Sequence, residues 1–323
     1  MTAQIQNPMP DGDVPGGVGN GTGGTGGAGG PRGDRGHRVS EDGLRRKKLL
    51  SFGLRGKVFV WISAVILGVA VLAALLAPWI SPYDPDEIDL MGLYDGPSAA
   101  HWFGTDNLGR DLLSRMLYGA RTALLGPLLV VVGSTILGML LGLLAAWRGG
   151  WVDAVLARVF DLLFAFPALL LAMLAVALFG KGLVAPVIAM CIAYAPIVAR
   201  LTRQQVMAQK NLPYVSAYRV QGFGGGRIAL TRVLPNVTPL VGAQSTLNFG
   251  YVLAELAGLS FLGLGVQAPT ADWGAMINEA QVGLLSAHYL PVAVPAIAVV
   301  LVVVAVNVLG EEFAERIGGG KNS

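Results

Sequence analysis

Residues 211–236, NLPYVSAYRVQGFGGGRIALTRVLPN, form a polar and basic interval between apolar runs that are long enough to cross a bilayer. Asn211 and Pro213 predict a helix start, because asparagine caps helices and proline has the φ of a first helical residue. The glycines that follow would break this helix, and a second short helix, 227–234, is expected to stop before Pro235. The interval therefore predicts two helical pieces outside the membrane, which form a rigid knob.

The charge of this interval has two interpretations. Its arginines are Arg219, Arg227 and Arg232. Short basic loops are what the positive-inside rule predicts for any cytoplasmic connection between two spans. The charge alone therefore leaves open whether the knob has a function of its own.

A family pattern favours a function. The interval resembles the EAA loop of bacterial ABC-importer permeases, in which an E-A-A triplet precedes a glycine and an L-P pair closes the motif. The positions that match are Ala217, Arg219, Gly222, Leu234 and Pro235. Ser216 stands where the family usually has Glu, and the glycines 224–226 replace residues that normally continue a helix. In this family the loop is called the coupling helix and docks into a groove on the ATPase subunit, so the resemblance implies that Ser216 and the matching positions form that contact.

The composition excludes an ordinary soluble globule. The 323-residue chain is 54% hydrophobic and 13% charged, and its mean hydropathy is +0.60. The single cysteine, Cys191, lies in an apolar run, so neither a disulfide framework nor a cysteine-based metal site can form within the chain. The three histidines are far apart and share no spacing typical of metal ligands: His37, His101 and His288.

The N-terminal part divides into a tail and an anchor. Residues 1–45 are expected to be a disordered cytoplasmic tail, because thirteen glycines fall between Gly12 and Gly36 and almost no apolar residue accompanies them. A basic cluster, 45–48, then precedes a long apolar run. This run is too long and too far from the start for a cleaved signal peptide. Residues 46–80 are therefore predicted to be an anchor and the first span.

Six apolar runs are each near the roughly 20 residues that a span requires. They are 58–80, 120–146, 160–179, 184–203, 237–264 and 290–310. If the basic tail is cytoplasmic, alternation places 19 of the 23 lysines and arginines inside. The expected protein is thus an all-α membrane protein with both termini in the cytoplasm, a core at 120–315 and a short tail at 316–323.

The segment 81–119 is too long for a simple connection and is predicted to lie outside. Asp106 is expected to cap a following helix, whose apolar face at the membrane interface would be Leu112, Leu113, Met116 and Leu117. The pattern F-G-T-D-x-x-G-R-D, followed by S-R-x-x-x-G-A-R, is similar to that of the C-type permease subunit of dipeptide and oligopeptide importers. It is carried by residues 103–121.

Few charged residues fall inside or beside the spans, where each is costly. Asp153 and Asp161 are expected to pair with Arg158 at the inner end of the third span. Glu255 is predicted near the outer mouth of the fifth span, either as a partner for another helix or as part of an outer gate. It opens the stretch 255–274, ELAGLSFLGLGVQAPTADWG, which resembles a second signature of the same permease subunit.

No motif for catalysis or nucleotide binding was found. Gly180-Lys181 is followed by glycine, not by Ser or Thr, so it is no P-loop. The resemblance covers about residues 50–315 and implies the six-span architecture of type I ABC importer permeases. It also implies a non-enzymatic subunit in a bacterial inner membrane.

The resemblance implies partners as well. They are a second permease subunit, two ATPase subunits that use ATP and Mg, and an extracytoplasmic protein that delivers short peptides, with the lipid bilayer as the surroundings and no nucleic acid. Nickel and haem importers share this subunit type and remain alternatives for the substrate. A secondary transporter, a channel or a membrane scaffold is a less favoured class.

Overall fold

The computed structural model describes residues 38–319, with side chains described for 57–317. Residues 52–323 form one compact unit. Across the described range the ordered elements are helices, with a single isolated β-bridge between Thr105 and Asp111. The predicted disordered tail, 1–45, stays a prediction for residues 1–37, which lie outside the described range, whereas residues 38–45 are the first residues of the helix α1 (Arg38–Ile80).

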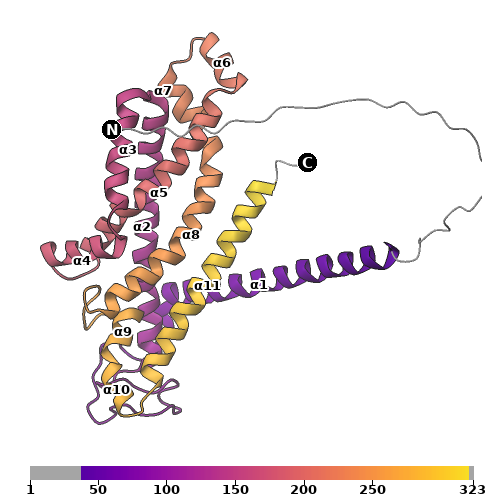
Figure 1. Ribbon diagram of the computed structural model, residues 1–323. Coiled ribbons are helices and arrows are strands. Elements are labelled where there is room, and N and C mark those ends of the chain that lie inside the picture. Colours follow the sequence, from indigo (N-terminus) through magenta and orange to yellow (C-terminus); the bar gives the residue numbers. More distant parts are fainter. Residues whose placement is uncertain (1–37, 320–323) are drawn as a thin grey trace, which may run out of the picture. The chain divides into compact units, whose positions relative to one another are not determined.

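The helices follow one another in the order shown in Figure 1. They are α1 (Arg38–Ile80), α2 (Leu112–Arg148), α3 (Gly150–Phe164), α4 (Ala168–Phe179), α5 (Val184–Lys210), α6 (Pro213–Val220), α7 (Gly225–Ile228), the π-helix η1 (Ala229–Val233), α8 (Leu234–Phe261), α9 (Trp273–Glu279), α10 (Gln281–Leu285) and α11 (Leu290–Gly319).

Four of the described helices are long and apolar enough to cross a membrane. They are Lys57–Ile80, Leu112–Arg148, Val184–Lys210 and Leu290–Ile317. A fifth span results if α3 and α4 count as one. The helix α8 has 28 residues, but its polar side chains, among them Asn236, Gln244 and Asn248, keep it out of this set. The all-α membrane class is therefore confirmed, and the count of six spans stays a prediction.

The predicted third span, 160–179, is wrong as a single straight helix. The helix α3 starts at Gly150 and ends at Phe164, and α4 leaves it at an angle of 83°. The break lies at Pro167, whose ring removes a backbone donor and disfavours helical geometry at the preceding residue. In Figure 1, α3 runs beside α2 and α4 turns away from it.

The helices α2 and α5 pack backbone to backbone. A Cβ atom at Gly138 would lie 2.6 Å from the Ala195 carbonyl oxygen, and one at Gly142 would lie 2.4 Å from that of Ala199. Small residues at these positions let the two helices approach closely, which is how membrane helices associate without a hydrophobic driving force from water. This pair forms the frame on which the knob and the outer segment are built.

The segment 81–111, which we call the outer segment after its predicted location, joins α2 differently from the prediction. The helix α2 runs without interruption from Leu112 to Arg148, so there is no separate interfacial helix. Its cap is Asp111, whose Oδ2 accepts hydrogen bonds from the Ser114 amide and hydroxyl at 2.8 and 2.7 Å. The predicted cap at Asp106 is wrong, because that carboxylate accepts from the amides of Leu108 and Arg110 in the preceding turn.

Candidate functional site

The knob starts one residue later than the sequence predicts. Pro213 is the first residue of α6, but its N-cap is Leu212, in an extended conformation. Asn211 instead ends α5 as its C-cap. The predicted asparagine cap is thus wrong, because proline's fixed φ starts the new helix by itself.

The glycine break is confirmed at Gly222. Its φ is +82°, a left-handed conformation that side-chain-bearing residues rarely adopt. The turn closes through hydrogen bonds from the Gly222 amide to the Arg219 carbonyl at 3.0 Å and from the Phe223 amide to the Tyr218 carbonyl at 3.1 Å. A Cβ at Gly222 would meet no atom within 4 Å, so the backbone angle alone requires glycine there.

The sequence predicted that the second helix of the knob stops before Pro235, and this prediction is wrong. The helix α7 continues through the π-helix η1 into α8, and Pro235 lies in the first turn of α8. The Leu234 amide bonds to the Ala229 carbonyl, one residue further back than in an α-helix. This wider π-turn accommodates the proline, which lacks the backbone donor that would otherwise continue the helical hydrogen-bond ladder.

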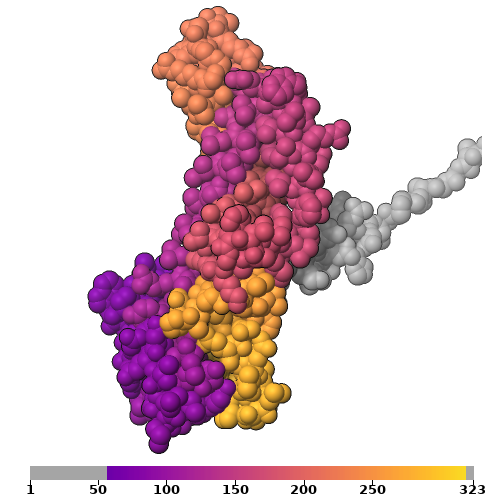
Figure 2. Space-filling model, turned by 90° about the vertical axis from the view of Figure 1, so that its left-hand side faces the viewer, coloured from indigo at the N-terminus to yellow at the C-terminus, as the bar shows by residue number. Residues whose placement is uncertain are grey.

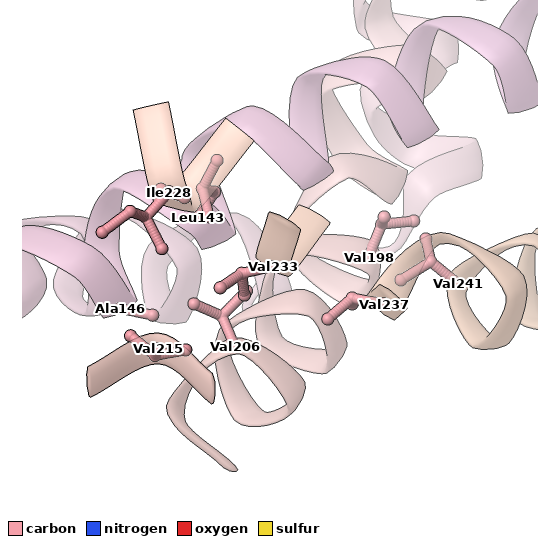
Figure 3. Close-up of a cluster of buried hydrophobic side chains, with 10 residues drawn as sticks. Leu143, Ala146, Val198, Val206, Val215, Ile228, Val233, Val237 and Val241 are labelled. Carbon is pink, nitrogen blue, oxygen red and sulfur yellow. The ribbon is translucent and has the colours of Figure 1, made fainter. Parts of the chain in front are cut away.

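The knob has its own hydrophobic core. Val215 of α6, Ile228 of α7 and Val233 of η1 are almost fully buried against the C-terminal halves of α2 and α5. Figure 3 shows Val215 and Val206 together with Leu143 and Ala146 in this cluster. Six helical elements, α2, α5, α6, α7, η1 and α8, therefore share one packed core, as the predicted rigid knob requires.

Aromatic rings hold the basic side chains of the knob. The Arg232 guanidinium lies 4.8 Å from the centre of the Tyr218 ring, and that of Arg227 lies 5.3 Å from the Phe223 ring. The two rings themselves meet edge to face, 5.4 Å apart. These cation–π contacts fix the arginines on the surface of the knob.

Lys210, the last residue of α5, binds the start of the knob to α2. Its Nζ donates to the carbonyl oxygens of Ala146 and Trp147 at 3.0 and 2.9 Å, at the C-terminal end of α2. A cation at this end also complements the helix dipole. The Arg219 guanidinium lies 5.9 Å from the Trp147 ring on the same side. The last turn of α2 is thus bound to both α5 and α6.

The structure places the predicted coupling residues on this knob. Ser216, Ala217 and Arg219 are exposed on α6, and Leu234 and Pro235 lie at the start of α8. Sequence reasoning missed Val220, which ends α6 with 90% of its surface exposed. A valine at the end of a short helix in a basic loop, two residues before Gly222, is the signal that could have identified it.

A second group of charges lies in the outer segment. Arg110 Nε donates to Asp106 Oδ2 at 2.8 Å, and Arg110 Nη2 donates to Glu279 Oε2 at 2.5 Å. Arg115 Nη1 donates to both carboxylates, at 2.9 Å to Glu279. The Arg115 and Arg110 side chains are only 1% and 2% exposed. We call these four residues the outer network; it joins the start of α2 to α9.

One further contact joins the same elements, and a local cap fixes the start of α9. Trp273 Nε1 donates to the Met116 carbonyl at 3.1 Å. Asp272 caps α9 by accepting from the Ala275 amide at 3.1 Å. Burial raises the pKa of the Asp272 carboxyl.

The remaining predicted charges form ion pairs between α3 and α5. Asp153 pairs with Arg203 of α5 at 2.5 and 2.6 Å, and Asp161 pairs with Arg200 at 2.6 Å. The predicted pairing with Arg158 is wrong, because α3 and α5 face each other at these positions.

Glu255 on α8 is partly buried, and Tyr194 of α5 faces it. Its Oε2 is buried and has no hydrogen-bond partner among the described residues. Within residues 57–317, no group of three histidine, cysteine or acidic side chains is placed to hold a metal ion.

The helix α2 thus carries the knob at its C-terminal end and the buried outer network at its N-terminal end. Two models of known protein families match the chain. Residues 138–319 match the model of the binding-protein-dependent transport system inner membrane component. Residues 53–97 match the N-terminal transmembrane domain of oligopeptide transport permease C. The chain belongs to the binding-protein-dependent transport permeases. As a member of this family of transport components it is a permease subunit of an ABC importer and not an enzyme.

Curated permeases cover most of the chain. The dipeptide transport system permease protein DppC of Alkalihalophilus pseudofirmus is 37% identical over 274 residues, 85% of this chain and 86% of the relative. The di/tripeptide transport system permease protein DppC of Pseudomonas aeruginosa is 43% identical over 254 residues, covering 76% and 83%. The glutathione transport system permease protein GsiD of Pectobacterium atrosepticum is 38% identical over 254 residues, covering 78% and 83%.

Proposed function

We propose that this permease forms half of the translocation pathway of an ATP-driven importer for short peptides. The observation that carries the substrate class is the set of similar permeases, whose names specify dipeptides, di- and tripeptides, and glutathione. All of these are peptides of two or three residues. These names favour a peptide as the substrate over nickel or haem, which the sequence left as alternatives.

The knob is the proposed contact with the ATPase. Its exposed α6 presents Ser216, Ala217 and Arg219, while the opposite side of the helix is buried on α2 and α5. A packed knob that is bound to the end of α2 through Lys210 moves as a unit with that helix. ATP and Mg are used in the ATPase subunits, and hinge motion there is transmitted through this rigid element.

The complete transporter in this proposal contains a second permease subunit, two ATPases and an extracytoplasmic binding protein. The protein lies in the bacterial inner membrane, with six spans and both termini in the cytoplasm. The strong asymmetry of its lysines and arginines supports this orientation. In the alternative, a secondary transporter, uptake would continue without ATPase subunits.

The orientation predicts which sites react with an impermeant thiol reagent. With Cys191 replaced by alanine, single cysteines at Gly96 and Gln267 are expected to be labelled from outside in intact cells. A cysteine at Gly224, on the exposed knob, should be labelled only after the membrane is opened. Labelling at Gly224 in intact cells would invert the orientation.

Uptake tests the substrate and the role of Glu255 together. Reconstituted vesicles that contain the complete complex should accumulate a di- or tripeptide when ATP and the binding protein are present. The change Glu255→Gln keeps the size of the side chain and removes its charge, so we expect slower uptake with normal assembly. The physical reason is that a partly buried carboxylate with an unpaired oxygen can meet the free amino group of a peptide.

Three outcomes of this experiment are distinct. Absence of uptake by the wild-type complex for every peptide tested would contradict the substrate class. Normal uptake by the Gln variant would leave Glu255 a packing residue between α5 and α8. Uptake without ATP would favour the secondary transporter.

A further inference from the structure

A cavity of about 270 Å³ lies in the outer part of the protein, apart from the knob and from Glu255. The outer segment forms one wall, and the turn that leads into α11 forms the other. Figure 2 shows the outer segment, in indigo, next to the gold residues of this region. The lining residues used below are Tyr94, Asp95, Phe103 and Tyr289.

The walls of this cavity are held in place. The ring of Tyr94 stacks on that of His288, with centroids 4.5 Å apart and an angle of 20°. Tyr94 and Ala287 have φ values of +55° and +60°, and among the described residues they are the two non-glycine residues in this conformation. Both line the cavity. Such strain persists only where the surroundings enforce it, which makes the cavity a preformed feature.

The chemistry of the cavity suits a cation. Asp95 is exposed, and its carboxylate forms no salt bridge within the described residues. The aromatic side chains of Phe103 and Tyr289 are 41% and 63% exposed. Residues 81–105 contain five acidic residues and neither lysine nor arginine. A cavity that is lined by an unpaired carboxylate and by partly exposed aromatic residues, in an acidic segment, attracts a guanidinium or ammonium group.

We propose that this cavity receives a lysine or arginine side chain of the extracytoplasmic binding protein when that protein docks. The inference rests on the proposed function, because it needs a binding protein to deliver the substrate. A docking that must be repeated in each transport cycle is steered by charge and buries little surface. A permanent contact with the second permease would be larger and more apolar, which a small cavity with an exposed carboxylate in an acidic segment does not fit.

The test compares two equal changes of charge. The binding protein that co-purifies with the wild-type complex is titrated onto nanodiscs that hold the complete transporter, and its Kd is measured at low and at physiological salt. Asp95→Asn should weaken binding about fivefold, as expected for the loss of an ion pair beside aromatic rings. Asp86→Asn removes the same charge from an exposed position outside the cavity and should change the Kd less than twofold. ATP hydrolysis without the binding protein should be unchanged in both variants.

A charge exchange makes the test specific. Asp95→Lys should weaken binding further, and changing one surface lysine or arginine of the binding protein to glutamate should restore it. Equal affinities for the Asn and wild-type proteins would overturn the inference while leaving the proposed function intact. Loss of the second permease from the Asp95→Lys complex would also overturn it, because the cavity would then belong to the permease interface. If the wild-type complex itself does not respond to any binding protein, the proposed function fails first.

Discussion

The change Arg115→Met is expected to lower the free energy of unfolding by about 3–5 kcal/mol. Arg115 is 1% exposed and serves both carboxylates of the outer network. Removing it leaves Asp106 and Glu279 with Arg110 as their only cation in that network. Methionine fills a similar volume, so the cost comes from the unbalanced buried charge. Thermal unfolding of the purified complex in detergent measures this loss of stability.

A control lies on the same helix. Arg121 is exposed on α2, and Arg121→Met should change the unfolding temperature little. Arg115→Lys should fall between the two, because a lysine keeps the charge but cannot reproduce the fork of the guanidinium. Equal stability of the Met variants at positions 115 and 121 would show that the outer network does not stabilise the fold.

The change Gly222→Val is expected to abolish ATP-driven uptake while the transporter still assembles. A β-branched residue at φ +82° costs about 1–3 kcal/mol in strain, and the turn after α6 relaxes to avoid it. The exposed face of α6 would then no longer be presented in the proposed orientation to the ATPase. Uptake and ATP hydrolysis in reconstituted vesicles, with subunit composition from size-exclusion chromatography, measure the two effects.

The matched control is Gly226→Val. Gly226 is also exposed and has open space around its Cα, but it lies in α7 with an ordinary helical φ. It should retain most of its uptake, since only helix propensity is lost there. If both variants transport normally, the knob does not transmit the ATPase motion. If both fail, bulk at this surface matters more than the backbone angle.

The sequence predicted the class of fold and the existence of the knob because both follow from local patterns. Long apolar runs predict helices, and Gly222 predicts a turn, without knowledge of any neighbour. The predictions failed where a neighbour decided the outcome. Pro235 continues a helix because a π-turn precedes it. Asp153 pairs with Arg203, fifty residues away, because α3 packs beside α5.

The outer network could not be derived from the sequence for the same reason. Asp106 and Arg110 are close in sequence and suggest a pair. Glu279 comes from α9, more than 160 residues further on, and only the packing of α9 against α2 brings it to Arg115. The pattern F-G-T-D-x-x-G-R-D thus indicated a family, while the buried ion pairs that Asp106 and Arg110 form became visible only in the fold.

The helix α2 is one continuous, rigid helix that side-chain contacts hold at both ends. From Arg115 in the outer network to Trp147 beside the knob it is one helix, roughly 50 Å long at 1.5 Å per residue. A helix cannot shorten without breaking its hydrogen bonds. A displacement imposed on the knob must therefore reappear at the outer network as tilt, or be absorbed by bending at Pro127, where the hydrogen-bond ladder is already interrupted.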